Sequence, residues 1–193
     1  MSGAWLREEQ ADLAVEKILE AASIAFVELG VSQAGMVDIA KYAGCSRGTL
    51  YRYFKTRHEL HLAYVNHCAL GISDRVRAGL MEIEDPHERL IEGVVRSCRE
   101  VRAIPGAAAW FEPGDSGIAA RMSGGSEVLA AMAGAFVAQL LGNRDGDAAD
   151  PMRAHWLIRV MVSLLTIPCE SEAEERDLIR RFVAPALLGD PSN

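Results

Sequence analysis

The chain has 193 residues, of which 50% are hydrophobic and 24% charged, enough apolar material for a sizeable core in one or two compact units. Its longest uncharged stretch, 128–143, falls short of the ~20 apolar residues that a membrane span needs, and the N-terminus lacks the layout of a signal peptide. The composition therefore predicts a cytoplasmic protein without a membrane partner.

The net charge of -7 is unevenly distributed. Residues 1–64 hold seven basic and eight acidic side chains, whereas the remaining 129 hold 13 and 19. Because an acidic body repels DNA, any contact with nucleic acid should be confined to a local basic region. The four cysteines are far apart and form neither a CxxC pair nor a zinc cluster, which favours reduced thiols packed as small apolar side chains. Cys45 also leaves a redox-sensing role open.

The N-terminal region begins with a polar arm over residues 1–12. Apolar residues then follow a helical period from Leu13 to Leu29, and Gly30 closes that predicted helix. A loop over 31–35 separates it from the next element.

Residues 38–57 predict two short helices joined by a tight turn. Asp38 can cap or open the first helix, and Gly44 can end it in a left-handed conformation. Ser46 is a good N-cap for the second helix, in which Leu50 and Phe54 form an apolar i, i+4 pair. The spacing is typical of a helix-turn-helix.

This segment is also a basic island. Between Ile39 and His58 there is no acidic residue but five basic ones: Lys41, Arg47, Arg52, Lys55 and Arg57. With Leu50 and Phe54 facing inward, the helical wheel points Gly48, Thr49, Arg52 and Tyr53 outward. A solvated helix face without a partner is the simpler interpretation, but charge, turn and aromatic residues together favour a phosphate backbone.

The rest of the chain predicts further helices at 57–83, 86–104, 126–141, 151–167 and 172–188, the last interrupted by Pro185. Residues 105–126 predict short helical turns and loops, and 142–150 a polar surface loop. Three histidines (His58, His61, His67) and the loop acids Asp145, Asp147 and Asp150 are considered as metal ligands, but neither set has a metal-binding pattern. We expect no metal, no cofactor and no catalytic residue.

The motifs in the first third of the chain resemble the DNA-binding domain of the TetR/AcrR family of bacterial transcriptional regulators. The resemblance covers residues 14–62 and rests on ILEAASIAF (18–26) with Gly30, DIAKYAG (38–44) and SRGTLYRYF (46–54). It implies an all-α fold, with an N-terminal three-helix helix-turn-helix head (1–56) and a larger helical body (57–193) for ligand binding and dimerisation.

The resemblance also implies roles for individual residues. Arg47, Gly48 and Thr49 would lie nearest the base edges, where Arg47 suits guanine and Thr49 suits thymine. The phosphate contacts would come from Tyr51, Tyr53 and Arg57, although Tyr51 also lies at the edge of the core face. Further phosphate partners are Lys41, Arg52 and Lys55. Gly35 stands where many relatives place a threonine, so that side-chain contact is absent.

For the body, the resemblance implies a homodimer formed through the last two helices and a small-molecule effector. Two apolar helices at the chain end point independently to a self-complementary face. Candidates for an apolar ligand site, for each of which core packing is an equal alternative, are Tyr64, His67, Trp110, Phe111, Met132, Phe136 and Trp156.

The predicted function is that of a sequence-specific repressor, released from a palindromic double-stranded operator by a small, mostly apolar ligand. Two other classes remain open. One is a structural DNA-binding protein without an effector, and the other is an enzyme built on the helical body, although no catalytic motif stands out. An activating role is also compatible with the sequence.

Overall fold

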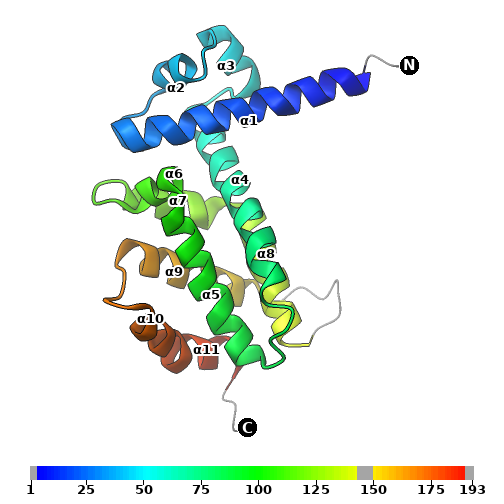
Figure 1. Cartoon of the computed structure of the whole chain (residues 1–193), viewed down its shortest axis with the longest axis vertical. Helices are drawn as coiled ribbons and strands as arrows, with labels where there is room; N and C mark the ends of the chain where they lie inside the picture. The colour runs from blue at the N-terminus through cyan, green and yellow to red at the C-terminus, as the bar shows by residue number, and fades with distance from the viewer. Residues whose placement is uncertain (1–3, 143–149, 190–193) are drawn as a thin grey trace.

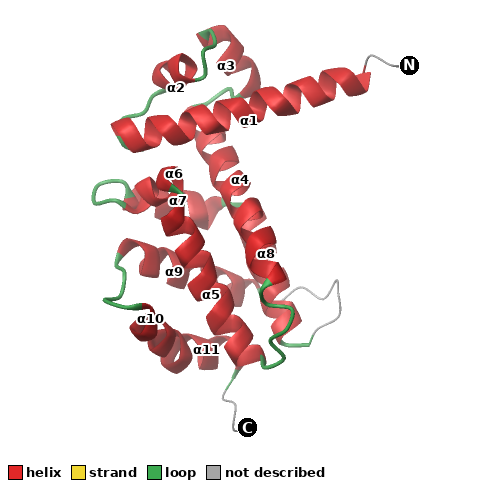
Figure 2. Cartoon of the chain, in the orientation of Figure 1, coloured by secondary structure: helices red, strands yellow, loops and turns green. Residues whose placement is uncertain are grey.

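The computed structural model describes residues 4–142 and 150–189, and every regular element in these ranges is helical. This confirms the all-α prediction (Figure 2). The greater part of the polar loop predicted at 142–150, with Asp145 and Asp147, lies outside the described residues. No helix of the described part is long and apolar enough to cross a lipid bilayer.

The N-terminal helices are α1 (Ala4–Leu29), α2 (Met36–Tyr42) and α3 (Arg47–Tyr53). The predicted arm is wrong from residue 4 onward, because α1 begins there and projects well beyond α2 and α3 (Figure 1). Residues 4–12, AWLREEQAD, contain neither Gly nor Pro and are mostly good helix formers, so nothing in them stops the helix.

Helix α4 (Arg57–Ala78) runs from this head into the body (Figure 1). It ends five residues before the predicted limit of 83, since Gly79 and the turns after it break the helix. The body continues with α5 (Pro86–Ala103), α6 (Pro105–Ala108), the 3-10 turn η1 (Ala109–Phe111), α7 (Ser116–Gly125) and α8 (Glu127–Leu140). The short turns predicted over 105–126 are thus present, but α7 is a full helix.

The chain closes with α9 (Pro151–Thr166) and a helical stretch made of α10 (Glu172–Leu178), the π-turn η2 (Ile179–Val183) and α11 (Ala184–Leu188). The π-turn directly precedes Pro185. A proline ring inside a helix clashes with the carbonyl four residues earlier and removes one hydrogen bond, which explains the wider turn here.

Two large hydrophobic cores support the fold, beside a small cluster of Ile72, Val76 and Leu80. The first joins Phe26, Ile39 and Leu50 of the head to Leu60 of α4, and it also takes in Trp110, Ala119 and Met122 from the body. The second lies among α5, α8, α9 and the C-terminal helices, with Leu90, Val137, Leu157 and Ile179 at its centre. Because body residues complete the head's core, the head is fastened to the body by more than α4 alone.

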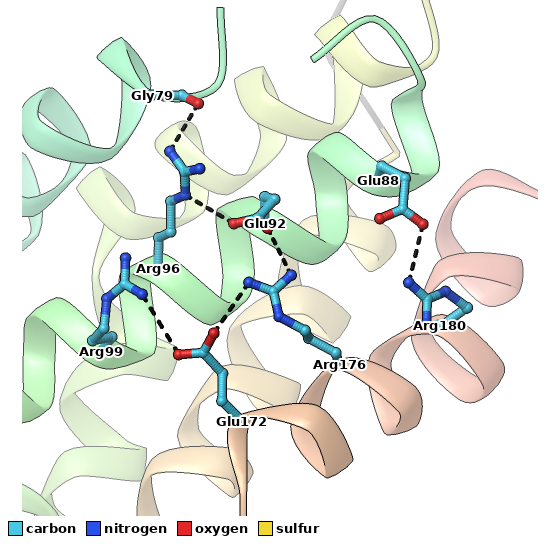
Figure 3. Close-up of polar contacts among 8 residues, drawn as sticks. All are labelled: Gly79, Glu88, Glu92, Arg96, Arg99, Glu172, Arg176 and Arg180. Carbon is cyan, nitrogen blue, oxygen red and sulfur yellow. Dashed lines mark hydrogen bonds and ion pairs between the residues drawn. The ribbon is translucent and has the colours of Figure 1, made fainter. Parts of the chain in front are cut away.

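Ion pairs tie the C-terminal stretch to α5 (Figure 3). Glu92 lies between Arg176 of α10 at 2.6 Å and Arg96 of its own helix at 2.8 Å. Arg96 in turn donates to the carbonyl of Gly79 at the end of α4. Residues of three elements therefore share one polar network, which fixes α10 relative to α4 and α5.

Candidate nucleic-acid interface

The helix-turn-helix follows from local backbone chemistry. Gly44 has φ of 63°, a left-handed conformation that suits glycine, and its amide closes α2 by donating to the carbonyl of Lys41. Ser46 then caps α3, its hydroxyl accepting from the Thr49 amide at 3.0 Å. The predicted turn at Gly44, Cys45 and Ser46 is confirmed.

The start of α2 differs from the prediction. Gly35 is the N-cap and Asp38 lies in the first turn, where its carboxylate accepts from the Gly35 amide at 3.2 Å. Asp38 therefore stabilises the beginning of α2 without being its capping residue, because the helix already starts at Met36.

The first residues of α3 form an exposed surface. Arg47 and Gly48 are exposed and Thr49 is half-buried, with its hydroxyl 2.9 Å from that of Ser46. Leu50 is fully buried and anchors the helix from the opposite side. The N-terminus of α3 thus presents a guanidinium, a bare backbone and a hydroxyl to solvent, which are groups that can meet base edges.

Two arginine–tyrosine pairs extend this surface. The Arg47 guanidinium lies 5.9 Å from the ring centre of Tyr51, and that of Arg52 lies 5.1 Å from the ring centre of Tyr53. Tyr51 is exposed, whereas the half-buried Tyr53 packs against the first core. Each ring holds a positive charge at the surface by cation–π contact.

The three other predicted phosphate partners differ in their surroundings. Lys55 is exposed, and Lys41 is exposed but has the carboxylate of Asp38 at 3.7 Å. Arg57 is half-buried and donates through Nη2 to the carbonyl of Val31, while its buried Nε has no partner. Arg57 therefore holds the turn after α1, a role that the sequence did not reveal.

The seven candidate ligand residues do not meet in one place. A hollow of about 180 Å³ between α1 and α4 is lined by Tyr64 and His67, among others. Trp156 lines a separate open hollow on α9 with Met152, His155 and Arg159. Phe111 and Phe136 pack at the edges of the hydrophobic clusters, and Met132 is half-buried on α8.

Trp110 belongs instead to a buried aromatic cluster at the junction of head and body. It stacks on Tyr64 with ring centres 6.0 Å apart, and Phe26 and His61 meet it edge-on at 5.4 and 5.0 Å. Burial, reinforced by the nearby Arg57, lowers the pKa of His61 to about 4. The imidazole is therefore neutral at physiological pH and acts as an aromatic packing group.

Asp115 is the residue at this junction that sequence analysis missed. Its carboxylate, from the body, accepts hydrogen bonds from the backbone of Val31 and Ser32 in the head. An aspartate before a predicted short helix looks like an ordinary cap, so no sequence pattern could have revealed a contact over 84 positions.

Comparison with known proteins decides the family. The model of bacterial regulatory proteins of the tetR family matches residues 18–64. The uncharacterized HTH-type transcriptional regulator Rv1255c of Mycobacterium tuberculosis is 39% identical over 181 residues, which cover 94% of this chain and 89% of Rv1255c. This chain belongs to the TetR family.

A TetR-family protein is a helix-turn-helix transcriptional regulator, and the family is not one of enzymes. Among solved structures, RolR in complex with resorcinol has a TM-score of 0.63 at 16% identity, covering 93% of this chain and 88% of RolR. The repressor AlkX from Dietzia sp. has a TM-score of 0.59 at 21% identity, covering 89% of this chain and 93% of AlkX. At these identities the likeness supports the TetR fold alone, including its helical C-terminal body.

Proposed function

We propose that this TetR-family regulator is a homodimeric repressor that binds a palindromic operator through α3 and leaves it when a small, mostly apolar molecule binds the body. The observation that carries the proposal is the capped N-terminus of α3, where Arg47 and Gly48 are exposed in a segment without acidic residues between 39 and 58. Arg47 to Thr49 would read bases, and Lys41, Tyr51, Arg52, Tyr53, Lys55 and Arg57 would contact phosphates.

Dimerisation through α9 and the C-terminal stretch is supported by their exposed apolar side chains. Phe182 is 71% exposed and Trp156 44% exposed, although both are large and apolar. Burying such side chains against a second copy gains free energy in proportion to the area removed from water. A two-fold dimer would bring two copies of α3 to successive major grooves, about one helical turn apart.

The effector is proposed from two lines of argument. RolR, which shares the fold, was solved with resorcinol, and AlkX is described as a repressor implicated in biodegradation of n-alkanes. In this chain the body (57–193) carries several apolar helices and lacks the basic surface of the helix-turn-helix. The effector must bind one arrangement of the two heads more tightly than the other. Only such a difference in affinity can shift the equilibrium between the two arrangements. Such a regulator would act in the bacterial cytoplasm.

The proposal is tested first by selecting bound sequences from random duplex DNA with the purified protein at near-physiological salt. Enrichment of one palindrome is expected, and sedimentation of the complex should give two protein chains per duplex. Weak, salt-sensitive binding without enrichment would contradict sequence-specific regulation.

A reporter carrying the selected palindrome over its promoter separates repression from activation. Lower reporter output with the regulator than without it is expected, and higher output would identify an activator. The selected duplex also serves as the probe for small aromatic and aliphatic compounds, scored by release of the protein. If none of a broad set released it, a DNA-binding protein without an effector would be the better description.

A further inference from the structure

Asp115 joins the body to the head at a buried point. Its two carboxylate oxygens accept from the amide of Val31 at 2.8 Å and the amide of Ser32 at 2.9 Å. Only 7% of Asp115 is exposed, so water competes little for these bonds. Hydrogen bonds from N–H groups to an ionised carboxylate are among the strong ones in proteins.

Because Asp115 bonds to the head, its side chain does not cap its own helix, α7. Asp115 occupies the N-cap position of α7, where an aspartate commonly accepts from amides of its own first turn. Here the side chain makes no capping bond to α7. Both oxygens are directed to the head, and the local cap is left unmade.

The turn that receives Asp115 is shaped for it. Gly30 ends α1 with φ of 80°, and a Cβ at that position would lie 3.3 Å from the Asp115 carboxylate. Arg57 donates to the carbonyl of Val31, the residue whose amide bonds to Asp115. The backbone at Val31 is thus held between a body carboxylate and a guanidinium of α4, five residues before α2 begins at Met36.

On the body side, Asp115 directly precedes α7. Helix α7 packs against α9, and in Figure 1 α7 lies between α6, next to the head, and α9. The exposed Trp156 of α9 belongs to the proposed dimer face. A chain of packed elements therefore leads from that face, through α7 and Asp115, to the turn that enters the helix-turn-helix.

We propose that Asp115 is a positioning residue that fixes the angle of the helix-turn-helix on the body, and with it the separation of the two heads in the dimer. This rests on the proposed function as a dimeric operator-binding protein. An N–H···O bond weakens steeply beyond ~3.2 Å, so a shift of α7 by about half an ångström is enough to loosen the contact. The position of α7 therefore determines whether the contact, and with it the angle of the head, is kept.

The test compares Asp115→Asn with Glu112→Gln, a matched loss of charge at an exposed side chain three residues earlier in the same segment. Asparagine keeps the size but sets an NH₂ group against one of the two backbone donors.

Affinity is measured by fluorescence anisotropy on duplexes that carry the selected half-sites at the native spacing, and one base pair closer or farther. For Asp115→Asn we expect a loss of about five- to tenfold at the native spacing, and a smaller loss at the altered spacings. Glu112→Gln should match the wild type.

If Asp115 only stabilised the fold, Asp115→Asn would lower affinity by the same factor at every spacing, because partial unfolding reduces the amount of protein that can bind. Equal loss at all spacings, or no loss at all, would overturn the positioning role. If the wild type selected no palindrome, the proposed function itself would fail, which is a separate outcome.

The wild-type protein offers a second measurement that needs no folded variant. Hydrogen exchange at the amides of Val31 and Ser32 should be slow in the free protein and slower still on the selected duplex, since DNA binding and the closed contact favour the same arrangement. Rapid exchange of both amides in the free protein, or exchange that DNA leaves unchanged, would count against the proposal.

Discussion

At the scale of single residues, Arg47 carries the proposed reading of sequence. Its guanidinium is exposed at the first position of α3, beside the ring of Tyr51. Arg47→Ala should weaken binding to the selected operator by roughly 1–3 kcal/mol, because one base contact is lost. For duplexes in which the contacted base pair is already altered, the same substitution should cost much less. Binding titrations against all single-base variants measure this.

Lys55→Ala is the matched control for that experiment. Lys55 is exposed just after α3, so its removal should weaken binding to all sequences alike. A uniform loss in both variants would mean that Arg47 also contacts phosphate rather than a base.

Arg57 has two proposed roles that one variant separates. If it contacts phosphate, Arg57→Ala should weaken binding to all sequences and reduce the slope of log affinity against log salt by about 1. Because its guanidinium also holds the Val31 carbonyl, the variant should lose about 1–3 kcal/mol of stability. Salt titrations and denaturant unfolding give the two results, and a lower stability with an unchanged slope would leave only the structural role.

His61 gives the protein a predictable response to acid. Its pKa is about 4 in the folded state, against 6.5 when exposed, since burial and Arg57 disfavour the imidazolium. The unfolded chain therefore binds a proton first as pH falls, and stability is lost between pH 6.5 and about 4, by up to ~3 kcal/mol.

His61→Phe removes this titration and keeps an aromatic ring in the cluster. The free energy of unfolding of wild type minus that of the variant should therefore fall as pH drops from 6.5 to about 4. A difference that stays constant across this window would show that His61 is not the responsible group.

At the scale of elements, the turn between α2 and α3 depends on one backbone angle. Gly44 has φ of 63°, and apart from its two chain neighbours no residue comes within 4 Å of where its Cβ would be. Gly44→Ala should thus cost about 1–2 kcal/mol from backbone strain alone, without a clash.

Gly124 provides the comparison, because it lies in α7 and its Cβ would also meet nothing within 4 Å. Gly124→Ala should raise stability by roughly 0.5–1 kcal/mol. Thermal unfolding of both variants checks the signs, and a neutral Gly44→Ala would argue against a left-handed turn at this position.

At the scale of the whole molecule, the proposed dimer depends on a few exposed apolar side chains. Phe182→Arg should convert the dimer into monomers and abolish cooperative binding to the palindrome, since a charge would have to be buried in the interface. Met81→Arg is the control, because Met81 is equally exposed, at 76% against 71% for Phe182, but lies between α4 and α5. Sedimentation at micromolar concentration measures the oligomeric state of both variants. If Phe182→Arg remained a dimer, the interface would lie elsewhere.

The sequence by itself determined the helical content, the helix-turn-helix and the family. These depend on local chemistry: the apolar i, i+4 pairs, the left-handed Gly44 and the serine cap at Ser46 all act within a few residues. Helix ends were less certain, as α1 and α4 showed, because a polar segment such as 4–12 can be helical without any apolar pattern.

Only the tertiary structure decided what lies between the head and the body. Trp110, for which a ligand site and the core were equal alternatives, completes the head's core, and Arg57 and Asp115 both bond to the backbone of Val31. These contacts join positions 26 to 84 residues apart, so they depend on how the helices pack against one another. Side-chain type specifies what a residue can bind, but packing alone places the partner within reach.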